Sequence, residues 1–144
     1  VAAASSALAN HANTVAGNLA GASLAGGINN FFYGNSAGNA TASGNFNVAV
    51  GNSALSKNVS GGVNTAIGDA ALRDSVSLNY NTAIGGGALK YLVTGSDNVA
   101  VGPNVMGDAT NVSSCTAVGG SETMRNIRQG TRNTAIGQGA LRYI

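Results

Sequence analysis

The chain has 144 residues, of which 22 are glycine and only 8% are charged, and it contains no tryptophan. Hydrophobic residues reach 44%, but most of them are alanine and valine, so few large side chains exist to fill the core of an ordinary globular domain. The net charge of +2 comes from few groups, which excludes a basic arm for nucleic acid, and no apolar run is long enough to span a membrane.

Residues 1–12 form an alanine-rich start that we treat as a degenerate lead-in. Asn10 and His11 interrupt its apolar character, and it lacks the basic segment that opens a signal peptide. His11 is the only histidine of the chain. Without a partner for catalysis, it is expected to be solvated or packed.

A pentapeptide recurs along the rest of the chain. The sequence Asn-Thr-Ala-Ile-Gly occupies 64–68, 81–85 and 133–137, and related pentapeptides begin at 47, 98 and 115. The starts at 47, 64, 81, 98 and 115 are 17 residues apart, and the step from 115 to 133 is 18, so one residue is inserted there. Backward steps of 17 from 47 reach 30 and 13. Residues 13–144 are therefore predicted to hold coils that start near 13, 30, 47, 64, 81, 98, 115 and 133.

The period and its punctuation predict a β-solenoid. Helical repeats need a period of about 30 residues or more, whereas short β-branched segments bounded by glycine are typical of strands. With the asparagine numbered 0, glycine stands at +4 in every copy, and +7 and +8 carry a second apolar pair such as Ala71-Leu72. Each coil is read as strand, glycine turn, short apolar strand and polar turn. The predicted fold is an all-β, parallel β-solenoid of about eight coils that rise about 4.8 Å each.

Alternation along the strand predicts the role of each position. Side chains at +1 and +3 share one face, and those at 0 and +2 share the other. The larger side chains at +3 and +8 are expected to fill the coil. This predicted core consists of Ile67, Leu72, Ile84, Leu89, Val101, Met106, Val118, Ile136 and Leu141.

Position +2 is alanine in six copies, and a strand that is apolar on both faces is usually buried on both. The alanine column is therefore expected to meet a second copy of the chain in a homo-oligomer. The predicted oligomer seam consists of Ala49, Ala66, Ala83, Ala100, Ala117 and Ala135.

The remaining positions suggest structural roles. The asparagines at 0 could form a hydrogen-bonded ladder along the axis or simply suit a turn, and the sequence leaves both open. Cys115 replaces one of them and is expected to be a small buried side chain, since no second cysteine or acidic cluster accompanies it. Charged residues gather at +9 and +10, directly after the inward leucine, and predict an outer solvated ridge. They are Lys57, Arg73, Asp74, Lys90, Asp108, Arg125 and Arg142.

The pattern Asn-Thr-Ala-Ile-Gly-x-x-Ala-Leu, repeated at 17 residues, closely resembles the repeat in shafts of phage-type tail fibre and spike proteins. It is more loosely similar to the head repeats of trimeric autotransporter adhesins, which fold as a left-handed parallel β-roll in a trimer. The resemblance is specific over 47–144 and weaker over 13–46. It implies a left-handed, homotrimeric surface fibre.

Catalysis is not expected within this chain. Glycoside cleavage typically needs two carboxylates flanking the bond, and only Asp74 and Asp108 share a repeat position, two coils or about 10 Å apart. A serine nucleophile needs a histidine partner, and the only histidine is His11 in the lead-in; we also find no signature of a cofactor or a metal site.

The sequence therefore predicts the structural shaft of an extracellular fibre on a virion or bacterial surface. Its expected partner is itself, with a host receptor or glycan bound outside or at the end of this segment, and with neither nucleic acid nor membrane insertion. The alternative is a head or stalk segment of an autotransporter adhesin. A third reading is an ice-binding β-solenoid, because threonines recur at +1, although Phe31, Val48 and Val99 interrupt that column.

Overall fold

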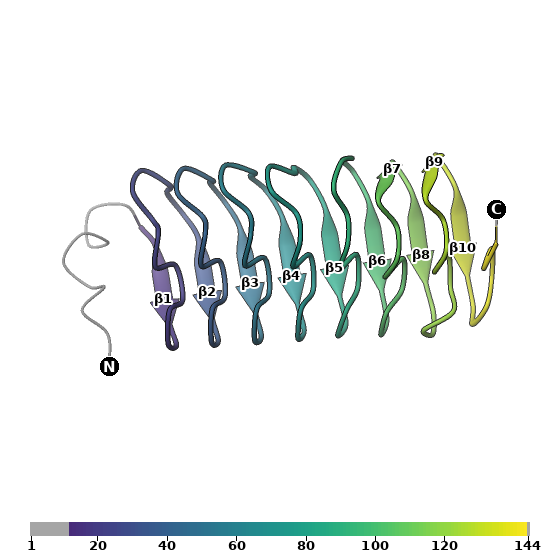
Figure 1. The fold of residues 1–144 in the computed structure, drawn as a ribbon, viewed down its shortest axis with the longest axis horizontal. Helices are drawn as coiled ribbons and strands as arrows, with labels where there is room; N and C mark the ends of the chain where they lie inside the picture. Colours follow the sequence, from purple (N-terminus) through teal and green to yellow (C-terminus); the bar gives the residue numbers. More distant parts are fainter. Residues whose placement is uncertain (1–11, 144) are drawn as a thin grey trace.

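The computed structural model describes residues 12–143, which wind into a rod of stacked coils (Figure 1). The predicted lead-in falls, except for Ala12, outside the described residues. Every strand within 12–143 is three residues long. The strands are β1 (Thr14–Ala16), β2 (Phe31–Tyr33), β3 (Val48–Val50), β4 (Thr65–Ile67), β5 (Thr82–Ile84), β6 (Val99–Val101), β7 (Asn111–Ser113), β8 (Thr116–Val118), β9 (Gln129–Thr131) and β10 (Thr134–Ile136).

The main sheet is parallel and runs the length of the rod in the order β1-β2-β3-β4-β5-β6-β8-β10. Each strand pairs with the equivalent residues one coil away, such as Thr65 with Thr82, while Thr116 pairs with Thr134 across the inserted residue. A smaller parallel sheet joins β7 and β9. The eight strands of the main sheet mark about seven turns, and the residues that the structure describes contain no helix. The predicted all-β, parallel solenoid with a 17-residue period is confirmed.

The apolar pair at +7 and +8 is a turn, and the prediction of a second strand there is wrong. The residue at +8 has a left-handed backbone, with φ of 49° at both Leu72 and Leu89 and 48° at Met106. A strand requires φ near −120° to −140°, so this segment cannot extend a sheet. The turn aims the long side chain at +8 into the coil, where all three are fully buried.

The two faces of the main strands are the reverse of those predicted. The alanines at +2 point into the coil: five of them have no exposed surface and Ala135 is 3% exposed. The +3 residues point outward, with Ile67 and Ile84 each 38% exposed, Ile136 73% exposed, and Val101 and Val118 half-buried. Because each alanine is covered by its own coil, the predicted alanine seam offers no surface to a second chain. The residues concerned are Ala49, Ala66, Ala83, Ala100, Ala117 and Ala135.

The interior is narrow, which explains the small residue at +2. Alanine at +2 and leucine or methionine at +8 belong to one buried cluster along the rod. Where +2 is large, +8 is glycine: Phe32 is fully buried, and a Cβ on Gly38 would overlap its ring. Val15 and Gly21 repeat this exchange one coil earlier. The coil thus conserves volume between its two walls, as close packing requires. Leu141, in the last described coil, is 39% exposed.

The glycine at +4 turns the chain out of the main strand. Gly85 has φ of 131°, a region that L side chains rarely adopt, and a Cβ there would overlap the carbonyl oxygen of Gly102 in the next coil. Gly86, its neighbour, has no such φ, and its added Cβ would meet only the carbonyl oxygen of Asp69 at 3.9 Å.

Gly85→Ala is therefore expected to lower the free energy of unfolding by about 2–3 kcal/mol, from backbone strain and overlap with the next coil. Gly86→Ala is the matched control, with an expected change of less than about 0.5 kcal/mol. Urea denaturation followed by circular dichroism, at one protein concentration, measures both. Equal midpoints for the two variants would contradict this account of the +4 turn.

Candidate functional site

The outward face of the main sheet is a continuous uncharged surface, which we call the outer sheet face. It exists because alanine takes the inward side of each strand, so that +1 and +3 must point away from the coil. None of its sixteen side chains is charged, and all eight at +3 are apolar. The face consists of Thr14, Ala16, Phe31, Tyr33, Val48, Val50, Thr65, Ile67, Thr82, Ile84, Val99, Val101, Thr116, Val118, Thr134 and Ile136.

Apolar exposure on this face is concentrated at its aromatic and isoleucine positions. On β2, Phe31 is 43% exposed and Tyr33 is 59% exposed, and further along the sheet the isoleucines of β4, β5 and β10 are 38%, 38% and 73% exposed. Soluble monomers rarely present an apolar surface that runs along a whole sheet, and such a patch marks an interaction surface. The sequence pattern predicted that the +3 side chains lie in the core, so it did not predict this face as a surface.

The asparagines at position 0 form the hydrogen-bonded ladder that the sequence left open. Asn64 donates from Nδ2 to Asn47 Oδ1 at 3.1 Å and to the Leu78 carbonyl at 2.6 Å. Its own Oδ1 accepts the backbone N–H of Asn81 at 3.0 Å. The same pattern recurs between neighbouring coils, and the ladder asparagines from 30 to 98 are at most 2% exposed. These amides satisfy buried backbone groups, so their role is architectural.

Cys115 ends the continuous part of this ladder. Its backbone N–H still donates to Asn98 Oδ1 at 3.1 Å, and its thiol sulfur, in place of an amide oxygen, accepts from Asn133 Nδ2 in the next coil at 3.9 Å. The side chain is fully buried. Among the residues that the structure describes, no group of three or more His, Cys, Asp or Glu side chains could hold a metal ion.

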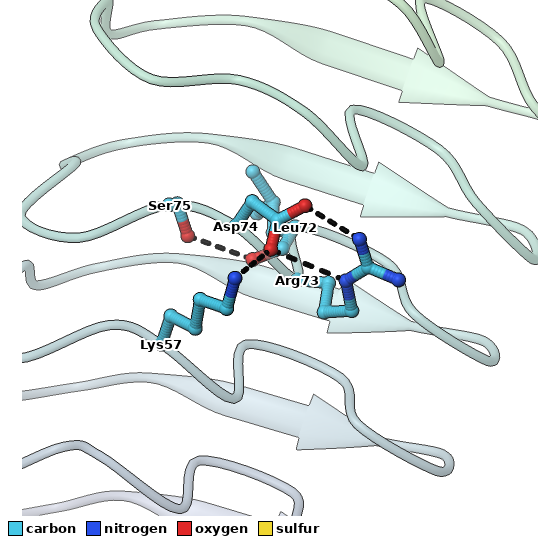
Figure 2. Close-up of polar contacts among 5 residues, drawn as sticks. All are labelled: Lys57, Leu72, Arg73, Asp74 and Ser75. Carbon is cyan, nitrogen blue, oxygen red and sulfur yellow. Dashed lines mark hydrogen bonds and ion pairs between the residues drawn. The ribbon is translucent and has the colours of Figure 1, made fainter.

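Most of the charged side chains at +9 and +10 make ion pairs, some within one coil and some between neighbouring coils. Asp74 stands at the centre of one cluster (Figure 2). Its carboxylate lies 2.6 Å from Lys57 Nζ and 2.6 Å from Arg73 Nη2. Arg73 also donates from Nε at 3.2 Å, so this pair is bidentate. The hydrogen bond from Arg73 holds the pKa of Asp74 below its ordinary value, and the same contact raises the pKa of Arg73.

A second cluster lies further along the rod. Arg125 donates from Nε to Asp108 at 3.1 Å and from Nη1 to Glu122 at 3.4 Å, while Arg142 Nε lies 2.6 Å from the other oxygen of Glu122. The hydrogen bond to Asp108 raises the pKa of Arg125.

Two exposed tyrosines accompany these charges. The Lys90 ammonium lies 4.9 Å from the ring centroid of Tyr91, and the Arg73 guanidinium lies 5.5 Å from it. Arg142 lies 4.9 Å from the ring centroid of Tyr143. A hydrogen bond from Lys90, together with its charge, lowers the pKa of Tyr91. An open groove lies between the rings, lined by Tyr91, Asp108, Thr110, Asn126, Arg128 and Tyr143.

We call this surface the charged ridge. It comprises Lys57, Arg73, Asp74, Lys90, Tyr91, Asp108, Glu122, Arg125, Arg128, Arg142 and Tyr143. The repeat positions indicated most of it in advance. Glu122, Arg128 and the tyrosines did not emerge as members, because they stand outside the repeated charge pattern or carry no charge.

No protein-family model matches the sequence, and neither a curated protein nor a solved structure is significantly similar to it. Over residues 12–143, the structure contains no helix of the length and apolarity that crossing a membrane demands.

Proposed function

We propose that this chain is the structural shaft of a homotrimeric surface fibre of the phage tail fibre or spike type, which supports attachment to a host. The observation that carries the proposal is the outer sheet face. It extends along all eight strands of the main sheet without a charge, and it exposes isoleucine and aromatic side chains in a single chain. A surface of this kind is stabilised when a second chain covers it.

The rod form supports the same function. Coils that repeat at a constant spacing give a body that lengthens without widening, which suits a spacer that carries a binding part away from a surface (Figure 1). The choice of three copies rests on the resemblance of the Asn-Thr-Ala-Ile-Gly repeat to trimeric fibres, and an extracellular location, on a virion or a bacterial cell, follows from the same resemblance. A stalk or head segment of an autotransporter adhesin is the alternative within this class.

Sedimentation equilibrium of the purified chain tests the proposal. The expected mass is three times 14.0 kDa, or 42.0 kDa, at micromolar concentration. A species of 14.0 kDa at that concentration would overturn the proposal.

Sedimentation, together with a measurement of thermal hysteresis, distinguishes a fibre shaft from an ice-binding protein. Five threonines at +1 do lie on the outer sheet face, which favours ice binding as a second candidate: Thr14, Thr65, Thr82, Thr116 and Thr134. An ice-binding face must remain open to water, however, so that function predicts a monomer with measurable thermal hysteresis. A trimer sealed along this face, without hysteresis, supports the shaft.

A further inference from the structure

The positive charge of the chain is concentrated on the charged ridge. Six of the seven Lys and Arg residues lie there with three of the five acids, which gives +6 − 3 = +3. The remaining charges are Arg132, Asp69 and Asp97, which give +1 − 2 = −1 and complete the net charge of +2. The ridge is therefore the one region of net positive charge in the sequence, and none of its residues belongs to the outer sheet face.

Two of its cations are available to a ligand. Within residues 12–143 neither Lys90 nor Arg128 forms an ion pair, whereas the other four cations of the ridge each have a carboxylate partner. Lys90 stands at the Tyr91 end of the groove, and Arg128 lines its middle. They belong to coils two steps apart, a separation of about 10 Å along the axis.

The groove between them combines aromatic and polar side chains in register. Tyr91, Asp108, Asn126 and Tyr143 follow one another at steps of 17, 18 and 17 residues, so they form a single column with a ring at each end. The two rings are three coils, or about 14 Å, apart along the axis. Both the carboxylate of Asp108 and the amide oxygen of Asn126 can accept hydrogen bonds from a ligand.

We propose that the charged ridge binds an anionic polysaccharide laid along the rod axis, with acidic groups at Lys90 and Arg128 and a sugar ring against Tyr91. The coil rise of about 4.8 Å is close to the length of one sugar unit in an extended chain. Cations two coils apart therefore match a polymer that carries an acidic group on every second sugar.

Hydrogen-bond chemistry favours a glycan over a nucleic acid. Sugars offer hydroxyl donors to Asp108 and Asn126, whereas a phosphodiester backbone has no donor for them. Asp74, Asp108 and Glu122 are interspersed along the ridge and would repel a polymer with a charge on every unit. The acidic group is a carboxylate or a sulfate ester, and both suit a lysine or arginine.

Fluorescence anisotropy with labelled polymers tests the proposal on the full chain. The probes are hyaluronate for carboxylate, keratan sulfate for sulfate, dextran as the neutral polymer and oligo-dT for nucleic acid. Hyaluronate or keratan sulfate is expected to bind more tightly than dextran and oligo-dT, and its binding is expected to weaken as salt rises. Which of the two binds more tightly identifies the acidic group.

The variants locate the site. The double variant Lys90→Gln/Arg128→Gln is expected to weaken binding of the better anionic glycan by about tenfold or more, and Tyr91→Ala by about fivefold. Arg132→Gln removes the one cation outside the ridge and is the matched control, with an expected change of less than about twofold. Sedimentation confirms that all variants keep the mass of the parent, so the result does not depend on which oligomer forms. Tighter binding of oligo-dT, equal binding of dextran, or equal losses in the double variant and the control would each overturn the proposal.

Discussion

Ile84→Arg is expected to convert the assembled protein into single chains that remain folded. Ile84 lies in the middle of the outer sheet face, 38% exposed and in register with Ile67 and Val101 on either side. An arginine there would place an unpaired guanidinium in an apolar seam, at a cost of several kcal/mol for each copy. In an assembly around an axis, the introduced charges would also repel one another.

Sedimentation equilibrium measures the mass, and circular dichroism measures the fold. Val76→Arg is the matched control, because Val76 is also an exposed β-branched side chain, at 48%, but lies outside the outer sheet face. The control is expected to retain the assembled mass at the same concentration. If both variants dissociate, or if neither does, the outer sheet face is not the interface between the chains.

The corresponding change at Ala83 cannot test assembly. Ala83 has no exposed surface and lies among the buried side chains of its own coil. An arginine there would disrupt the coil itself, so loss of mass would accompany loss of the fold. The distinction matters because Ala83 belongs to the column that the sequence first indicated as the seam.

The sequence predicted the register and period of the solenoid because these depend on identity between copies. Glycine at +4 and asparagine at 0 repeat where the backbone requires them, and one residue inserted after β8 shifts every later position by one. The facing of the strands was mispredicted for a physical reason. The larger residue, Ile67 for example, was taken to point inward, but the coil is too narrow to hold both a +3 isoleucine and a +8 leucine.

A signal for the correct facing was present in the early coils. Phe32 at +2 accompanies Gly38 at +8, whereas Ala66 at +2 accompanies Leu72 at +8. Two positions that exchange volume in this way occupy the same interior space. The left-handed backbone at +8 had no comparable signal, since leucine and methionine do not favour positive φ and adopt it here because burial of the side chain compensates.

The candidate site was predictable only in part. Repeat positions placed the charges on one outer column, which the ion pairs of Asp74 and Arg125 bear out. The groove depends on residues that do not repeat, Tyr91 and Tyr143 above all, and on the way that coils of unlike sequence stack. Periodicity describes what the coils share, and a binding site on a solenoid is built from what they do not share.

Asn64→Ala is expected to cause the largest loss of stability among these single substitutions, about 3–5 kcal/mol. The amide of Asn64 links three coils: it donates to Asn47 Oδ1 and to the carbonyl of Leu78, and it accepts the backbone N–H of Asn81. Alanine leaves the carbonyl of Leu78 and the backbone N–H of Asn81 buried without partners, and each carries a desolvation cost of about 1–3 kcal/mol, while Asn47 Oδ1 loses one of two donors and keeps the backbone N–H of residue 64.

Asn52→Ala provides the matched control from a second ladder with the same spacing. Asn52 donates from Nδ2 to Asp69 Oδ1 at 2.8 Å, one coil away, but this contact is exposed to water. Water can replace the lost partner, so the expected loss is less than about 0.5 kcal/mol. Urea denaturation at a fixed protein concentration compares the two variants. Similar midpoints would show that burial of the Asn64 amide does not make its hydrogen bonds more important for stability than the exposed one of Asn52.

The position of Asn64 adds a consequence for cooperativity. Each coil contacts only its neighbours, so the stability of the rod is approximately the sum of coils and interfaces. Weakening the central interface of β4 with β3 and β5 should let the two ends of the rod unfold separately. Asn64→Ala is therefore expected to broaden the unfolding transition or divide it, whereas Asn52→Ala leaves it single. A sharp, merely shifted transition would mean that the coils unfold as one unit, with a coupling stronger than the ladder alone provides.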